Sequence, residues 1–163
     1  MRLFIAIQLS EKMRMAISDV QEDLRRQGVR GNYTPRENLH LTLAFIGEYN
    51  DPDRVLDILE QVPMESFEIS LDGMGAFGDL WWIGLKPSKE LQGYVRQLRR
   101  AMAEGDIPFD RKRFSPHITI LRRASVEIAK VKIQPVERVS MVAVHASLMR
   151  SDRGRNGMIY TEI

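Results

Sequence analysis

The sequence of 163 residues predicts an α+β fold built mainly on antiparallel sheet. Three segments place apolar residues at helical spacing, and the segments between them alternate or cluster apolar residues over strand lengths. The order of elements also repeats loosely, because each half of the chain offers a helix, a strand with the same short motif and further strands. We therefore expect a pseudo-twofold arrangement of two similar lobes within a single domain that covers residues 1–163.

Three helices are expected, each with its own start and stop signals. Each begins after a residue whose side-chain oxygen can accept from free backbone N–H groups, and each ends near a glycine or proline. These signals are Ser10 and Gly28, Asp51-Pro52 and Pro63, and Ser88 and Gly105.

The segments between the helices have strand character. Residues 67–71 alternate apolar and polar side chains, and the glycines that follow are expected to break the chain before the next strand. A turn is expected at residues 152–154. The strands expected are 3–7, 40–43, 67–71, 80–85, one near residue 117, one around 139–148 and a last one at 158–163.

The composition excludes several classes of protein. Because the chain has no cysteine, it can form no disulfide framework, thiolate nucleophile or thiolate zinc site, which fits a reducing cytoplasm. No apolar run approaches the roughly 20 residues that span a bilayer, and the run at residues 3–7 is too short for a signal peptide. We expect a cytoplasmic protein without membrane contact.

The net charge of +2 hides an uneven distribution. Residues 48–72 carry one basic and eight acidic side chains, whereas residues 73–163 carry sixteen basic and nine acidic ones. Within residues 111–123 five of thirteen are basic, and Arg150, Arg153 and Arg155 form a second cluster. Such clusters attract phosphates, although charge alone is more typical of a solvated surface.

The most informative feature is a short motif that occurs twice, as His40-Leu41-Thr42-Leu43 and His117-Ile118-Thr119-Ile120. The strand period of two places His and Thr of each copy on one face, and the two aliphatic residues on the other, in a core. A single copy more often holds a structural histidine. Two copies half a chain apart, using two of only three histidines, indicate a shared site.

Two such strands side by side would bring two imidazoles and two hydroxyls together. With a pKa near 6.5, one ring can be neutral while the other is protonated, which supplies a general base and a general acid. The hydroxyls can donate to anionic oxygens, so the set suits in-line displacement at phosphorus without a metal. Metal binding is disfavoured because Thr, rather than a carboxylate or a further His, stands two residues after each histidine.

Other residues allow two interpretations each. Arg122, just past the second motif, could bind phosphate as a bidentate donor or be a surface arginine. His145 lacks a Thr two residues later and is interpreted as structural or incidental. At least one of Trp81 and Trp82 is expected in the core, with base stacking the less favoured role. Phe45 is predicted to be core, on the face opposite the motif histidine.

The paired motifs resemble those of the two-histidine phosphoesterase superfamily. Within it the chain is similar to the bacterial and archaeal RNA 2′,3′-cyclic phosphodiesterases, also called 2′-5′ RNA ligases. The likeness covers essentially the whole chain. It is carried by residues 2–7, 38–47, 67–77, 80–85 and 114–122, and by the end near Tyr160.

The resemblance implies a bilobal fold with two mainly antiparallel sheets facing a central cleft and helices on the outside. It also implies hydrolysis of RNA 2′,3′-cyclic phosphate ends to 2′-phosphates, with no metal and no cofactor. His40 would be the proton donor and His117 the proton acceptor, roles that the pattern itself leaves interchangeable. Thr42, Thr119 and Arg122 would bind the phosphate. The expected ligands are RNA ends or small cyclic nucleotides, bound by a monomer without an obligatory protein partner.

Three alternatives remain open at this stage. The first is a related enzyme that cleaves or ligates 2′-5′ linked oligonucleotides, or acts on a small cyclic nucleotide. The second is a non-catalytic nucleotide- or RNA-binding module, although His and Thr are intact in both copies. The third and weakest is a metallohydrolase.

Overall fold

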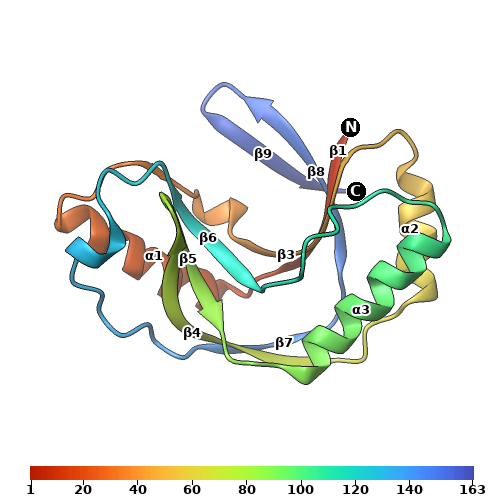
Figure 1. The fold of residues 1–163 in the computed structure, drawn as a ribbon, viewed down its shortest axis with the longest axis horizontal. Helices are drawn as coiled ribbons and strands as arrows, with labels where there is room; N and C mark the ends of the chain where they lie inside the picture. Colours follow the sequence, from red (N-terminus) through yellow and green to blue (C-terminus); the bar gives the residue numbers. More distant parts are fainter.

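The computed structural model describes residues 1–163 and places their strands in two antiparallel sheets. The strands are β1 (Arg2–Gln8), β2 (Asn32–Tyr33), β3 (His40–Glu48), β4 (Phe67–Phe77), β5 (Leu80–Leu85), β6 (His117–Arg122), β7 (Ser140–Ala143), β8 (Ser147–Gly154) and β9 (Gly157–Glu162). One sheet has the order β3-β1-β8-β9 and the other β2-β6-β5-β4-β7. Two short 3-10 helices, η1 (Arg36–Asn38) and η2 (Ile128–Lys130), lie in the connections. The predicted α+β class with two mainly antiparallel sheets is confirmed (Figure 1).

The three predicted helices are confirmed as α1 (Glu11–Arg26), α2 (Pro52–Gln61) and α3 (Lys89–Glu104). Their predicted caps form: Ser10 accepts from the Met13 N–H at 3.2 Å, and Ser88 accepts from the Leu91 N–H at 3.1 Å. Each such bond satisfies a backbone donor that has no partner within the helix. The α1 helix lies at one end of the molecule, while α2 and α3 lie together at the other (Figure 1). None of the helices is long and apolar enough to cross a membrane.

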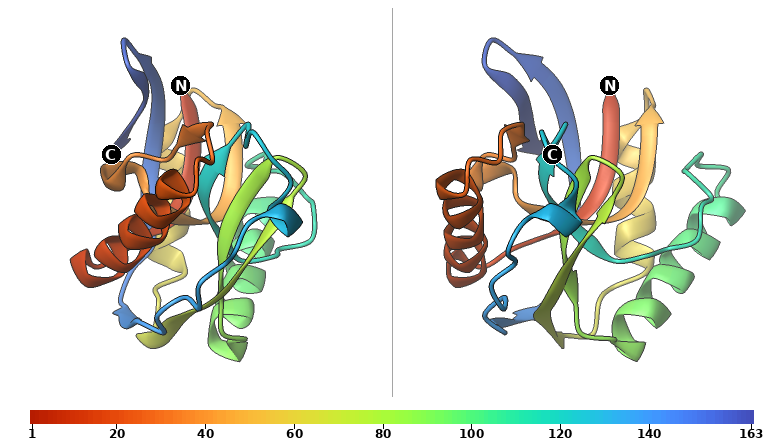
Figure 2. Two further views of the ribbon diagram at one scale, coloured as in Figure 1. Left: turned by 90° about the vertical axis from the view of Figure 1, so that its left-hand side faces the viewer. Right: turned by 60° about the vertical axis from the view of Figure 1, so that its left-hand side comes forward.

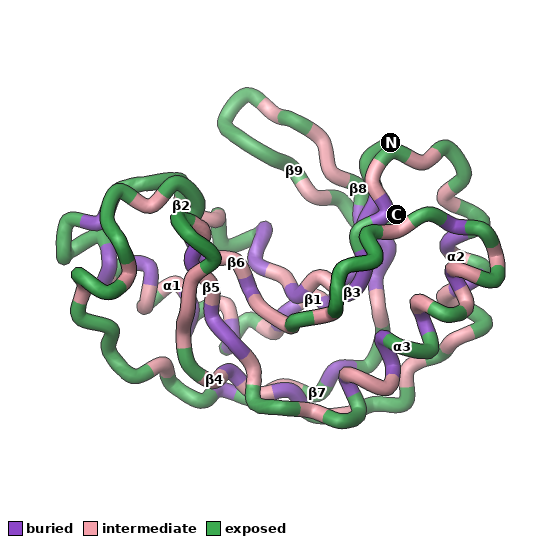
Figure 3. Tube along the Cα trace, viewed as in Figure 1, coloured by how far each residue is buried: buried purple, intermediate pink, exposed green.

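One cluster of 32 buried residues draws on both sheets and all three helices. In each motif copy the two aliphatic residues belong to this cluster and are fully buried. Figure 3 colours the whole trace by burial, and β3 and β6 contain both buried and partly buried positions. Burial of each such side chain contributes about 1.5–3 kcal/mol to folding. The motif strands are therefore fixed from behind, which gives their other face a defined position.

The two halves of the chain do not coincide with the two sheets. The C-terminal strands β8 and β9 extend the sheet of β1 and β3, whereas β2 from the first half pairs with β6 from the second. The loose repeat predicted two lobes, but it could not show this exchange, because periodicity identifies strands and not their partners.

Three strand boundaries differ from the prediction. Residues 139–148 do not form one strand, since β7 pairs with β4 while β8 pairs with β1 in the other sheet. The expected turn at 152–154 lies instead at Arg155 and Asn156, because β8 continues to Gly154. The glycines after residue 71 do not end the strand either. There β4 runs on to Phe77, with an irregularity in its pairing with β5 between Leu71 and Met74.

Candidate active site

Both motif histidines stand at the first position of a strand, His40 in β3 and His117 in β6. The two strands belong to different sheets and pack against each other. Along each strand the His and Thr are partly exposed while the aliphatic neighbours are buried. This is the two-sided arrangement that the period of two predicts.

The two imidazoles are held in the same way. His40 Nδ1 lies 2.6 Å from the Asn38 carbonyl oxygen, and His117 Nδ1 lies 2.8 Å from the Ser115 carbonyl oxygen. Because a carbonyl can only accept, Nδ1 carries the hydrogen in both rings, and Nε2 is left as the nitrogen with a free lone pair. The sequence holds no signal for these contacts, since any residue supplies a backbone carbonyl.

The two copies differ at Nε2. His40 Nε2 lies 2.8 Å from the Thr42 hydroxyl oxygen, which can donate to the neutral ring. No such bond joins His117 to Thr119, whose carbonyl instead accepts from the Thr34 hydroxyl at 3.0 Å. Of the two Nε2 atoms, only that of His40 is thus hydrogen-bonded to the Thr of its own motif.

The electrostatics connect the two copies. Burial holds the pKa of His40 below its usual value, and the positive charges of Arg122 and His117 lower it further. The hydrogen bond to the Asn38 carbonyl acts in the opposite direction by raising the pKa. Since Arg122 and His117 both come from β6, the fold brings His40 within electrostatic reach of the second motif copy. Arg122 is exposed and forms no ion pair with a carboxylate.

The prediction that Phe45 lies in the core is wrong. In the ladder Ile5 pairs with Ala44 and Ala6 with Thr42, so Leu43 is an extra residue on β3. This bulge shifts the alternation by one, and Leu43 and Ala44 are both buried. Phe45 consequently emerges on the face of His40 and Thr42, 40% exposed, with the Arg2 guanidinium over its ring.

Aromatic rings flank both histidines. The rings of Phe4 and Tyr160 lie 4.9 and 5.2 Å from His40, between ring centroids. Those of Phe77 and Trp82 lie 5.2 and 6.4 Å from His117. From the sequence, only Trp82 has a site role considered, the less favoured one of base stacking. The proximity of the rings to the histidines is not visible in the sequence, because each ring comes from another strand than its histidine.

Glycines make room for the indole of Trp82. A Cβ added at Gly75, its cross-strand partner, would lie 2.5 Å from the Trp82 ring. The expectation of at least one core tryptophan is confirmed by Trp81, which is fully buried, whereas Trp82 is half-buried beside His117. The alternation of side chains along β5 is the signal that could have shown which of the two tryptophans is buried.

The third histidine lies away from this constellation. His145 is exposed in the segment between β7 and β8 and takes no part in the contacts described above. Neither motif histidine belongs to a group of three or more His, Asp or Glu side chains that could hold a metal ion.

Comparison with known proteins extends the likeness beyond the motifs. The model of the 2′-5′ RNA ligase superfamily matches residues 11–155. A protein of Thermotoga maritima named RNA 2′,3′-cyclic phosphodiesterase is 32% identical over 132 residues, which cover 75% of this chain and 70% of that protein. A protein of the same name from Archaeoglobus fulgidus is 30% identical over 141 residues, covering 80% and 78% of the two chains. Among solved structures, Escherichia coli LigT in its apo form superposes with a TM-score of 0.87 at 28% identity, covering 99% of this chain and 94% of that one. LigT has also been crystallised with 3′-AMP.

Proposed function

We propose that this chain, which belongs to the 2′-5′ RNA ligase superfamily, is an RNA 2′,3′-cyclic phosphodiesterase that works without a metal. One observation carries the proposal: two strands present a His and a Thr each, and both imidazoles are fixed through Nδ1 with Nε2 left to exchange protons. The names of the relatives and the 3′-AMP complex of LigT support the choice of substrate.

The reaction would proceed by in-line displacement at the cyclic phosphate. His117 Nε2 takes a proton from water as the water oxygen bonds to phosphorus. The bond from phosphorus to the 3′-oxygen breaks, and His40 Nε2 gives its proton to that oxygen. The product is a 2′-phosphate with a free 3′-hydroxyl. Thr42, Thr119 and Arg122 would donate to the phosphate oxygens as charge develops on them.

The lowered pKa of His40 bears on its proposed role. A proton donor has to be protonated, whereas burial and two nearby positive charges favour the neutral ring in the free protein. The anionic phosphate of a bound substrate would offset the charges of Arg122 and His117. Substrate binding would thus raise the pKa of His40 and favour protonation of its Nε2, and this proton is the one that the leaving oxygen needs. The assignment of donor and acceptor follows the family resemblance, since the two copies are related by pseudo-symmetry.

The ligands follow from the same chemistry. RNA ends or small cyclic nucleotides supply the strained cyclic phosphate, and both motif copies come from one chain. We therefore propose a monomer that needs no obligatory protein partner. A cysteine-free chain of this kind fits the reducing cytoplasm.

The proposal is tested by replacing each histidine in turn. His40→Ala and His117→Ala should each lower kcat for 2′,3′-cyclic AMP by about 10²–10⁴-fold, the usual contribution of a general acid or base. His145→Ala is the matched control, and it should keep the wild-type rate because its side chain lies outside the constellation. Near-normal turnover by either motif variant would overturn the proposal.

A further inference from the structure

The β8–β9 hairpin stands out from the body of the molecule in several views (Figures 1 and 2). Its strands pair up to Gly154 and Gly157, and every residue of β9 except Tyr160 is exposed. The hairpin carries the arginine cluster of residues 150, 153 and 155, which the reaction chemistry does not use.

The hairpin is docked on the residues that hold His40. Its Tyr160 ring lies 5.2 Å from His40, edge-on, and 5.1 Å from Phe4. Asn38 Nδ2 donates to the Met158 carbonyl at 2.8 Å, while the Asn38 carbonyl accepts from His40 Nδ1. A ligand at His40 is therefore next to the root of this hairpin.

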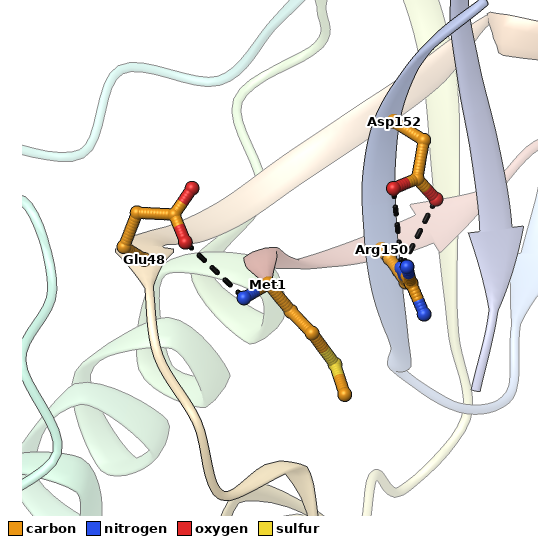
Figure 4. A network of polar contacts seen from close by, with 4 residues as sticks. All are labelled: Met1, Glu48, Arg150 and Asp152. Carbon is orange, nitrogen blue, oxygen red and sulfur yellow. Dashed lines mark hydrogen bonds and ion pairs between the residues drawn. The ribbon is translucent and has the colours of Figure 1, made fainter.

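The two faces of the hairpin differ in charge. Ser151 pairs with Tyr160 and Arg153 with Met158, and these pairs are two residues apart, so Arg153 shares the face of Tyr160. Arg150 lies on the opposite face, where its Nε is 3.0 Å from a carboxylate oxygen of Asp152 (Figure 4). Arg153, and Arg155 in the turn, are exposed and form no ion pair.

We propose that the Tyr160 face of this hairpin, with Arg153 and the tip Arg155, binds the RNA strand that leads to the cyclic phosphate. This proposal rests on the proposed function, since the reacting phosphate is at the 3′ end and the rest of the strand must leave the site. The hairpin provides what a single strand requires, an aromatic ring for a base followed by positive charges for phosphates.

The dimensions set the length of RNA that is bound. Tyr160 is three residues along β9 from Gly157, and Arg155 lies in the turn just beyond, so Arg155 is about 10–13 Å from Tyr160 at about 3.3 Å per residue. A stacked strand rises about 3.4 Å per nucleotide, so the hairpin reaches about three to four nucleotides upstream of the reacting one. A hexanucleotide should therefore be long enough to contact Tyr160, Arg153 and Arg155, whereas a mononucleotide should contact Tyr160 alone.

The test compares two substrates, 2′,3′-cyclic AMP and a hexa-adenylate that ends in a 2′,3′-cyclic phosphate. For the R153Q/R155Q variant, the ratio of kcat/KM on the hexanucleotide to that on the mononucleotide should fall on the order of tenfold at low salt. The slope of log kcat/KM against log salt on the hexanucleotide should become shallower by about 1.4, at about 0.7 for each phosphate contact removed. R150Q is the matched control and should keep both the ratio and the slope.

Two results would overturn the hairpin proposal. One is an unchanged ratio and slope in the double variant, and the other is an equal loss in R150Q, which would indicate a general effect of charge. Fluorescence anisotropy with a hexanucleotide ending in a 3′-phosphate separates this proposal from the proposed function, because it needs no turnover. Hairpin-dependent binding without hydrolysis of either substrate would contradict the phosphodiesterase alone. Hydrolysis of the mononucleotide, with RNA binding unaffected by the double variant, would contradict the hairpin alone.

Discussion

At the scale of single residues, His40 combines two requirements that oppose each other. It has to be buried enough to sit rigidly between Phe4 and Tyr160, and burial is the main cause that lowers its pKa. For its proposed role as proton donor it also has to exchange a proton near neutral pH. The carbonyl of Asn38 offsets part of the loss, since it stabilises the protonated ring. The positive charges of Arg122 and His117 lower the pKa of His40, and a bound anion would offset them.

We predict that NMR titration of the imidazole will find the pKa of His40 below 6.5 in the free protein. Arg122→Gln should raise this pKa because it removes a positive charge, and so should added inorganic phosphate. Arg123→Gln removes the neighbouring charge, which is not among the causes of the shift, and serves as the control. A pKa that stays the same in Arg122→Gln would show that the two strands are not electrostatically connected.

The same shift links stability to pH. The unfolded chain binds a proton at His40 near pH 6.5, while the folded protein binds it only at lower pH. The free energy of unfolding is therefore not reduced by His40 above pH 6.5. It falls as the pH drops from 6.5 through the lower pKa of the folded state, by at most about 1.4 kcal/mol per pH unit.

At the scale of elements, the bulge in β3 has its own anchor. Leu43 has no cross-strand partner in the register with β1, and its carbonyl accepts from Arg99 Nε at 3.3 Å and Nη2 at 3.0 Å. Arg99 Nη1 also donates to the Lys112 carbonyl at 2.7 Å. One guanidinium on α3 thereby joins β3 to the segment that leads into β6, and so connects the strands of the two motif copies.

Removal of this anchor should be costly. Arg99→Ala leaves the Leu43 and Lys112 carbonyls without their charged donor, and we expect the free energy of unfolding to fall by about 1.5–3 kcal/mol. Arg100→Ala, an exposed neighbour on the same helix, should change it by no more than about 0.5 kcal/mol. Urea denaturation measures both, and an equal effect of the two variants would refute the anchoring role.

Two glycines should respond oppositely to the same substitution. At Gly75 a Cβ would meet the rigid Trp82 ring at 2.5 Å, so Gly75→Ala should destabilise the protein by about 1–3 kcal/mol. At Gly93, inside α3, the nearest atom is Arg96 Nη2 at 3.9 Å. Gly93→Ala should stabilise by about 0.5–1 kcal/mol, the helix preference of alanine. Unfolding free energies that shift in the same direction would contradict the packing of Trp82.

At the scale of the whole molecule, local sequence patterns predict the helices and strands, whereas long-range strand pairing determines which side chains lie together in the candidate site. The strands of His40 and His117 follow from alternation, and the helix starts from Ser10 and Ser88, because these are local effects. The core prediction for Phe45 is wrong because the bulge at Leu43 depends on the pairing of β3 with β1, which a period of two does not predict. Tyr160 lies near the end of the chain, 120 residues after His40, so their contact can be known only from the tertiary structure.

We propose that the two motif histidines convert a 2′,3′-cyclic phosphate into a 2′-phosphate without a metal. The most direct measurement incubates RNA that ends in a 2′,3′-cyclic phosphate with the protein and excess chelator, and then identifies the product end. We predict undiminished turnover and a 2′-phosphate, since the 3′-oxygen is the leaving group. Activity abolished by the chelator and restored by Zn²⁺ or Mn²⁺, or a 3′-phosphate product, would rule out this metal-free reaction.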